Sequence, residues 1–211
     1  MKKHIVTLLC AAAVFSGCAG SNEQETKKLT LLAYDSFTPS EGIFDEFTKE
    51  TGITVEVVLG GDTGQLISKA ILTAGNPEGD VLWGVDNTFL TRAIKGEVFS
   101  SYTSPLTKNM AADVVKMTQP DGVVTPVDTG DVCINYDKKW FSERNVAPPQ
   151  SLEDLALPEY KDLLVVQNPA SSSPGLAFLL STIASFGEDG WQNYWKKLRA
   201  NGVKVVDGWT E

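Results

Sequence analysis

The sequence has almost no histidine and little cysteine. Its one histidine is His4, near the N-terminus, and its 211 residues include three cysteines. Without histidine in the body of the chain, no Ser-His-Asp or Cys-His catalytic arrangement can form, and no zinc or non-haem iron site that uses imidazole. The chain also contains no G-x-S-x-G elbow, Walker loop or G-x-G-x-x-G fingerprint. We therefore expect a protein that is not an enzyme and that needs no cofactor or metal.

Basic residues are also scarce. The chain has 18 Lys and Arg against 27 Asp and Glu, a formal net charge of −9 at pH 7. Removal of Lys2 and Lys3 with a leader would lower the basic count of 18 by two, to 16, and the net charge of −9 to −11. Such an acidic surface argues against nucleic acid as a partner and favours a cationic ligand.

The N-terminal residues are typical of an export signal. Residues 1–17 have a basic start, a short apolar run and then small residues, which predicts a secretory signal too short to remain as a membrane span. "FSGC" resembles the lipobox of bacterial lipoproteins, with Cys18 as the lipidated residue; an ordinary signal with an incidental cysteine is the alternative. Residues 18–28 then form a polar tether. We expect an extracytoplasmic protein held at the cell membrane by a lipid anchor.

One cysteine remains in the body of the chain, so a disulfide framework is excluded. Cys133 lies in the apolar stretch "VCINY", and we expect it to be a small buried residue.

Strand and helix patterns alternate from Leu29 onward. Strands are expected at 29–34, 53–59 and 80–85, with helices following each of them. For the first helix, Thr38 and Glu41 have capping-box spacing, and Ile43, Phe44 and Phe47 are expected to face the core. This β-α-β-α-β order predicts a doubly wound α/β lobe over residues 29–127.

A second α/β lobe is expected over residues 137–211. Two strand-like runs within 121–137 predict a crossing between the lobes, with a hinge at 128–136. Strands are expected at 163–168 and 203–208, a short helix at 151–160, a helix from Ser173 to about Phe186, and another that buries Trp191, Tyr194, Trp195 and Leu198 on one face. Two strands are few for a complete sheet, so we expect this lobe to be incomplete and the chain to be a fragment.

Loops after the predicted strands carry the candidate binding residues, because ligands of open α/β sheets bind beyond the carboxyl ends of the strands. These loops are "YDSF", "GGDTG", "WGVDN", "NPASSSPG" and "DGWTE". Their aromatics, carboxylates and hydroxyls suit an aromatic, cationic ligand. Each also has a local structural explanation: Asp35 and Asp62 as turn caps, and Ser173 before Pro174 as a helix N-cap.

Taken in order, these segments resemble the thiamine-binding solute receptors of bacterial ABC importers, relatives of ferric-iron and polyamine receptors. The resemblance extends from about Leu29 to Glu211 and is most telling in "YDSF", "VDN", "SSPG" and "GWTE". It implies a two-lobed fold of the type II periplasmic-binding-protein kind that closes over thiamine or its phosphates by a hinge motion. It further implies delivery to a membrane permease and action as a monomer.

The resemblance also implies roles for individual residues. Tyr34 would pack on the ligand, Asp62 would lie near its cationic part, and Trp209 would stack on it. Ser172, at the Pro174–Gly175 helix start, would receive the hydroxyl or phosphate end, with Ser173 as the cap. Asp35, Asp86 and Asn87 lie in the matching loops.

Two alternatives stay open at this point. A receptor of the same fold could take a polyamine or another small solute; ferric iron is discounted, because "YDSF" offers no adjacent tyrosine pair. A surface hydrolase with paired carboxylates belongs to a different class, and product release from a substrate would reveal it.

Overall fold

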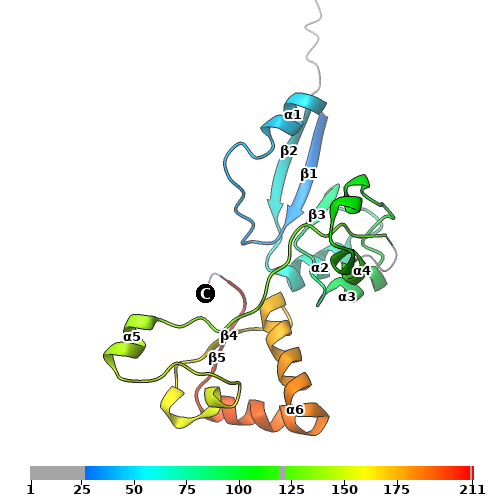
Figure 1. The fold of residues 1–211 in the computed structure, drawn as a ribbon. Coiled ribbons are helices and arrows are strands. Elements are labelled where there is room, and N and C mark those ends of the chain that lie inside the picture. Colours follow the sequence, from blue (N-terminus) through cyan, green and yellow to red (C-terminus); the bar gives the residue numbers. More distant parts are fainter. Residues whose placement is uncertain (1–26, 119–121, 210) are drawn as a thin grey trace, which may run out of the picture.

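The structure is a computed structural model that describes residues 27–118, 122–209 and 211. The predicted signal, the predicted lipidation site Cys18 and all but the last two residues of the predicted tether lie outside these residues. The described chain forms two α/β units, one with a three-stranded sheet and one with a two-stranded sheet. An extended segment connects them (Figure 1).

The first sheet has β1 (Lys27–Ala33) at its centre, flanked by β2 (Ile53–Leu59) and β3 (Val81–Trp83). All pairings are parallel, so the three carboxyl ends lie at the same edge of the sheet. The predicted strands are confirmed to within two residues at each end, and β2 has the predicted bounds. The tether prediction is wrong at its last two residues, because Lys27 and Lys28 already pair with Ile53 and Thr54.

The first helix begins later than the capping-box pattern predicts. Helix α1 (Asp45–Thr51) has Phe44 at its N-cap, without a side-chain cap, and Thr38 lies outside it. Gly42 explains the difference: its φ of +76° is left-handed, which interrupts a right-handed helix. The predicted core face is also wrong, because α1 buries none of its residues and Ile43 is 58% exposed.

Helices α2 (Thr63–Leu72) and α3 (Leu90–Lys95) build the core of the first unit. Helix α2 buries Leu66, Ile67 and Ala70 on one face. Ile67 packs in a cluster with Phe89 and Ala93, and Leu176 of the second unit packs against that cluster. The two units therefore share apolar contacts.

The segment between the units differs from its prediction. After η1 (Pro105–Asn109) and α4 (Ala112–Thr118), residues 122–137 contain no strand. Its apolar residues from Val127 to Tyr136 are exposed, Val132 by 51%, and Cys133 is exposed rather than buried. The sequence has strand-like composition here, but a strand also needs a second strand to pair with. In the described residues no strand pairs with this segment, although Gly122 O accepts from Tyr102 N at 2.9 Å.

The second unit contains a parallel pair, β4 (Val165–Gln167) and β5 (Lys204–Val206), with α6 (Ser173–Ala200) between them in sequence. At Gly187, a φ of +69° breaks α6 into two helical halves, as the sequence predicts. Its other elements are α5 (Lys138–Glu143) and two 3₁₀ helices, η2 (Asp154–Ala156) and η3 (Pro158–Tyr160). The two 3₁₀ helices lie where a short α-helix is predicted, at 151–160.

The halves of α6 fold against each other. Trp195 Nε1 donates a hydrogen bond of 2.9 Å to Thr182 Oγ1 across the break. Tyr194 and Leu198 are buried with Phe178 in one cluster, and Trp195 packs against it. The predicted core face is confirmed for Tyr194, Trp195 and Leu198, whereas Trp191 is half-buried and lies outside this cluster. None of the helices in the described ranges is both long and apolar enough to cross a membrane.

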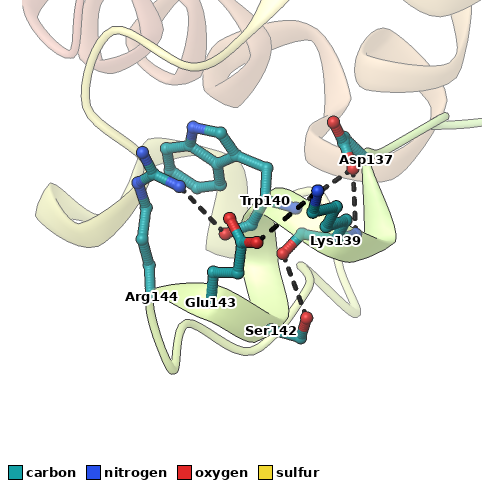
Figure 2. Close-up of polar contacts among 6 residues, drawn as sticks. All are labelled: Asp137, Lys139, Trp140, Ser142, Glu143 and Arg144. Atoms are coloured by element: carbon teal, nitrogen blue, oxygen red, sulfur yellow. Dashed lines mark hydrogen bonds and ion pairs between the residues drawn. The ribbon is translucent and has the colours of Figure 1, made fainter.

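Helix α5 follows the connecting segment and is not among the predicted elements. Figure 2 shows its polar contacts: Asp137 caps it by accepting from the N–H groups of Lys139 and Trp140, and the Arg144 guanidinium lies 4.4 Å from the Trp140 ring centre. Aspartate is a typical N-cap residue, but this helix is too short to show an apolar periodicity in the sequence.

Candidate functional site

A small cleft lies where the two units meet, beyond the carboxyl ends of β1, β2 and β5. The loops after β1 and β2 supply one wall and the segment after β5 supplies the other. Its lining residues are Asp35, Ser36, Asp62, Gln65, Asp207, Gly208, Trp209 and Glu211. The predicted position of the site, beyond the strand ends, agrees with this cleft.

Asp62 is the most constrained residue of the cleft. It is the N-cap of α2: its Oδ1 accepts from Thr63 N at 2.7 Å, and Gln65 Oε1 accepts from Asp62 N at 3.2 Å. The residue is only 7% exposed. Its second carboxylate oxygen, Oδ2, is buried and has no hydrogen-bond partner in the described structure. An unpartnered buried carboxylate oxygen costs free energy, so this atom is a strong candidate to meet a cation or a donor.

The surroundings of Asp62 disfavour its charge. Burial is the main cause that raises the pKa of Asp62 above its ordinary value, and the negative charges of Asp35 and Glu211 raise it further. The hydrogen bond from the Thr63 N–H opposes this effect, and so does the nearby Ser172 hydroxyl, although that hydroxyl donates its hydrogen bond to Gln167 Oε1. A bound cation would stabilise the ionised form and relieve the repulsion.

The rest of the first wall is fixed by backbone hydrogen bonds. Asp35 Oδ1 accepts from Gly61 N at 2.8 Å, and Asp35 N donates to Gly61 O at 3.0 Å. These two bonds join the loop after β1 to the loop after β2. Asp35 and Asp62 are thereby held on one rigid surface.

The second wall is the segment after β5. Glu211 Oε2 accepts from Gly208 N at 2.9 Å, and Asp207 Oδ1 accepts from Asn168 Nδ2 at 3.2 Å. Trp209 is 59% exposed. The walls touch at Gly208, where an added Cβ would lie 2.8 Å from Asp62 Oδ2. Glycine is needed here for the close approach.

The chemistry of the lining is that of a cation site. It holds four carboxylates, no lysine or arginine, and one exposed indole. Carboxylates attract positive charge, and indole is the best ring for cation–π contact and stacking. In the part of the chain that the structure describes, no three acidic, histidine or cysteine side chains are arranged to ligate one metal ion.

Three of the seven predicted ligand residues, Asp35, Asp62 and Trp209, line this cleft. Tyr34 is half-buried and is not among the lining residues; its ring lies against Gly84, where an added Cβ would approach Tyr34 Cδ1 to 2.4 Å. Ser172 is fully buried and its hydroxyl donates to Gln167 Oε1.

The cap of α6 differs from its prediction. Ser172, not Ser173, is the N-cap, because its extended backbone precedes the first helical residue. The Ser173 hydroxyl is buried without a hydrogen-bond partner in the described structure.

The structure places Asp86 and Asn87 outside the lining. Asp86 accepts from Thr88 Oγ1 at 2.8 Å and caps the turn before α3, while Asn87 is exposed. The residues that sequence reasoning missed are Gln65, Asp207, Gly208 and Glu211, with Ser36. The signal was present, since two of them are carboxylates that flank Trp209 in the predicted "DGWTE" loop.

Comparison with known proteins places this architecture. The chain is 30% identical to the "Thiamine-binding periplasmic protein" of Escherichia coli over 97% of its length and 58% of that protein. It is 29% identical to the Salmonella typhimurium protein of the same name, covering 100% of this chain and 61% of that one. The chain thus spans about three fifths of the curated relatives it matches.

Solved structures agree on the fold. A "Periplasmic thiamin binding protein" superposes with a TM-score of 0.64 and 26% identity, covering 87% of this chain and 56% of that one. The predicted fold class, a type II periplasmic binding protein, is confirmed. The family model described as "Bacterial extracellular solute-binding protein" matches residues 76–208, more than half of the chain. The chain therefore belongs to the bacterial extracellular solute-binding protein family.

Proposed function

We propose that this protein captures thiamine or a thiamine phosphate outside the cytoplasm and delivers it to the permease of an ABC importer. The observation that carries the proposal is the buried, unpartnered Oδ2 of Asp62 in a carboxylate-lined cleft beside the exposed ring of Trp209. Thiamine combines a permanent thiazolium cation with a flat aminopyrimidine ring. Such a ligand matches a charge partner and a stacking partner in the same cleft.

In this proposal each wall has its own task. Asp62 and Asp35 neutralise the thiazolium charge from the side of the first unit. Trp209 stacks on a ring of the ligand from the side of the second unit, and Tyr34 supports the first wall from behind. Asp86 and Asn87, which lie outside the lining, act on the ligand only if closure of the units brings their loop inward.

The start of α6 is proposed to receive the hydroxyl or phosphate end of the ligand. The N-terminus of a long helix attracts anions through its free N–H groups. Ser172 and the unpartnered Ser173 hydroxyl lie there. A Ser172→Ala variant should lose more affinity for thiamine phosphates than for thiamine; full retention of affinity for thiamine mono- and diphosphate would overturn this role.

The remaining features of the proposal concern the whole protein. A lipid on Cys18 would hold it at the membrane, the extended segment around 128–136 would act as the hinge between lobes 29–127 and 137–211, and the receptor would work as a monomer. Palmitate labelling of wild type and Cys18→Ala tests the anchor. Retained label in Cys18→Ala would contradict it.

A polyamine is the second candidate ligand. Four carboxylates in one cleft also suit a flexible polycation, and this is the specific observation in its favour. A polyamine has no ring, however, and leaves Trp209 without a stacking partner.

A tryptophan-fluorescence titration separates the candidates. Thiamine, its two phosphates and spermidine would be titrated in parallel into the protein without residues 1–18, both as this chain and as the whole protein. Saturable quenching by thiamine compounds supports the proposal, and recovery of unchanged ligand separates a receptor from a hydrolase. A response to spermidine alone would show that the ligand is a polyamine and not thiamine. A folded whole protein that responds to none of these compounds would refute the proposal.

A further inference from the structure

A tight backbone contact joins the two units behind the cleft. Gly64, in the first turn of α2, donates its N–H to Ser171 O at 2.6 Å. This bond crosses from the first unit to the loop between β4 and α6. It also satisfies one of the free N–H groups at the start of α2.

The contact has room for glycine alone. A Cβ on Gly64 would lie 2.5 Å from Ala170 O and 2.8 Å from Ser171 O. Both neighbours are backbone oxygens of one rigid turn, which cannot step aside as a flexible side chain would. To reach ordinary contact at 3.4 Å, the turn would have to retreat by about 1 Å.

Ser171 also makes a hydrogen bond to the second wall. It is 7% exposed, and its Oγ donates to Asp207 O at 2.7 Å. Asp207 begins the segment that carries Trp209 and Glu211 into the cleft. On the opposite side, Gly64 lies two residues after Asp62, in the same helical turn. One short chain of bonds therefore links the charged residue of the first wall to the segment that forms the second.

We propose that Gly64 and Ser171 are positioning residues, which set the distance between the two walls of the cleft without touching the ligand. The proposal rests on the proposed function only in taking this cleft as the ligand site. Because a cation must meet Asp62 and Trp209 together, a shift of about 1 Å between the walls should cost about tenfold in affinity.

Gly64→Ala is the direct test, with Gly75→Ala as its matched control. Gly75 follows the same helix, and an added Cβ there meets nothing within 4 Å. Two quantities would be measured on the whole protein: thiamine affinity by calorimetry, and the distance between the units by electron-resonance labels on one exposed site of each. Ser171→Ala keeps the carbonyl that accepts from Gly64 N and loses the hydroxyl that donates to Asp207 O, so it tests the second bond separately from the first.

We expect Gly64→Ala to widen the distance between the units and to weaken thiamine binding about tenfold, with Gly75→Ala unchanged in both. Ser171→Ala should weaken binding with no change in that distance, because only the link to Asp207 is cut. An unchanged distance in Gly64→Ala overturns the inference, whatever the affinity does. If wild type fails to bind thiamine while Gly64→Ala still widens the units, the proposed function fails and the positioning role stands.

Discussion

The two walls of the cleft are built in different ways. The first is held by bonds within its own unit: Asp62 caps α2, and the Asp35 loop is tied to Gly61 by two hydrogen bonds. The second is also held within its own unit, by bonds from Ser171 and Asn168 to Asp207, but it leaves Trp209 59% exposed. A rigid charged wall thus faces an accessible aromatic one. On this basis we propose that the buried Asp62 recognises the charge of the ligand and that the exposed Trp209 stacks on one of its rings.

The sharpest way to break this comparison is Asp62→Asn. Asparagine caps a helix about as well as aspartate but carries no charge. We expect thiamine affinity to fall roughly tenfold to hundredfold, the worth of a charge-assisted contact, while the free energy of unfolding stays the same or rises. Calorimetric titration and thermal unfolding measure the two effects. A variant that loses stability and binding together would show that Asp62 acts chiefly as a structural cap.

Removal of the aromatic partner tests the second wall. Trp209→Ala should weaken thiamine binding about threefold to tenfold, because a stacked or cation–π ring contact is lost. Stability should change by less than about 0.5 kcal/mol, since the side chain is largely exposed. Tyr102→Ala is the control, as Tyr102 is 64% exposed and lies outside the cleft lining. Equal affinities in the two variants would remove Trp209 from the site.

The pH dependence should distinguish folding from binding at the first wall. Burial raises the pKa of Asp62 in the folded state. At a pH between the pKa of the unfolded state and that of the folded state, Asp62 is therefore protonated in the folded protein and ionised in the unfolded chain. In that window the contribution of Asp62 to stability grows as pH falls, whereas affinity for a cation falls. Relative to Asp62→Asn, wild type should gain stability in unfolding experiments and lose thiamine affinity in calorimetric titrations as the pH falls through this window. If stability and affinity depend on pH in the same way in wild type and in Asp62→Asn, the charge role of Asp62 is contradicted.

The smallest effect on binding is expected away from both walls. Asp86→Ala removes the acceptor for Thr88 Oγ1 and should lower stability by about 0.5–1.5 kcal/mol. Affinity for thiamine should stay within about twofold, because Asp86 does not line the cleft. Denaturant unfolding and fluorescence titration check the two values. A tenfold loss of thiamine affinity would show that the Asp86 loop belongs to the ligand site.

Much of the fold follows from local patterns. The strands at 27–33 and 53–59, the inward face of α2 and the aromatic face around Tyr194 are predictable, because apolar periodicity and burial coincide there. The errors occur where a tertiary partner decides. Residues 122–137 have the composition of strands but no neighbour to pair with, and Thr38 has capping spacing before a left-handed Gly42.

The site shows the same division. Asp62 is recognisable from sequence as both cap and candidate ligand residue, since it begins a helix directly after a strand. The burial of its Oδ2 by Gly208, a residue 146 positions later, has no local signal. Nor has the close approach of Gly64 to Ser171, because it depends on how the two units meet.

The most direct test of the account is a crystal structure of the whole protein with thiamine bound. The account predicts thiamine between the two walls, with its thiazolium ring in contact with a carboxylate oxygen of Asp62 and one of its rings stacked on Trp209. Thiamine bound away from this cleft, with Asp62 Oδ2 still covered by Gly208, would contradict it.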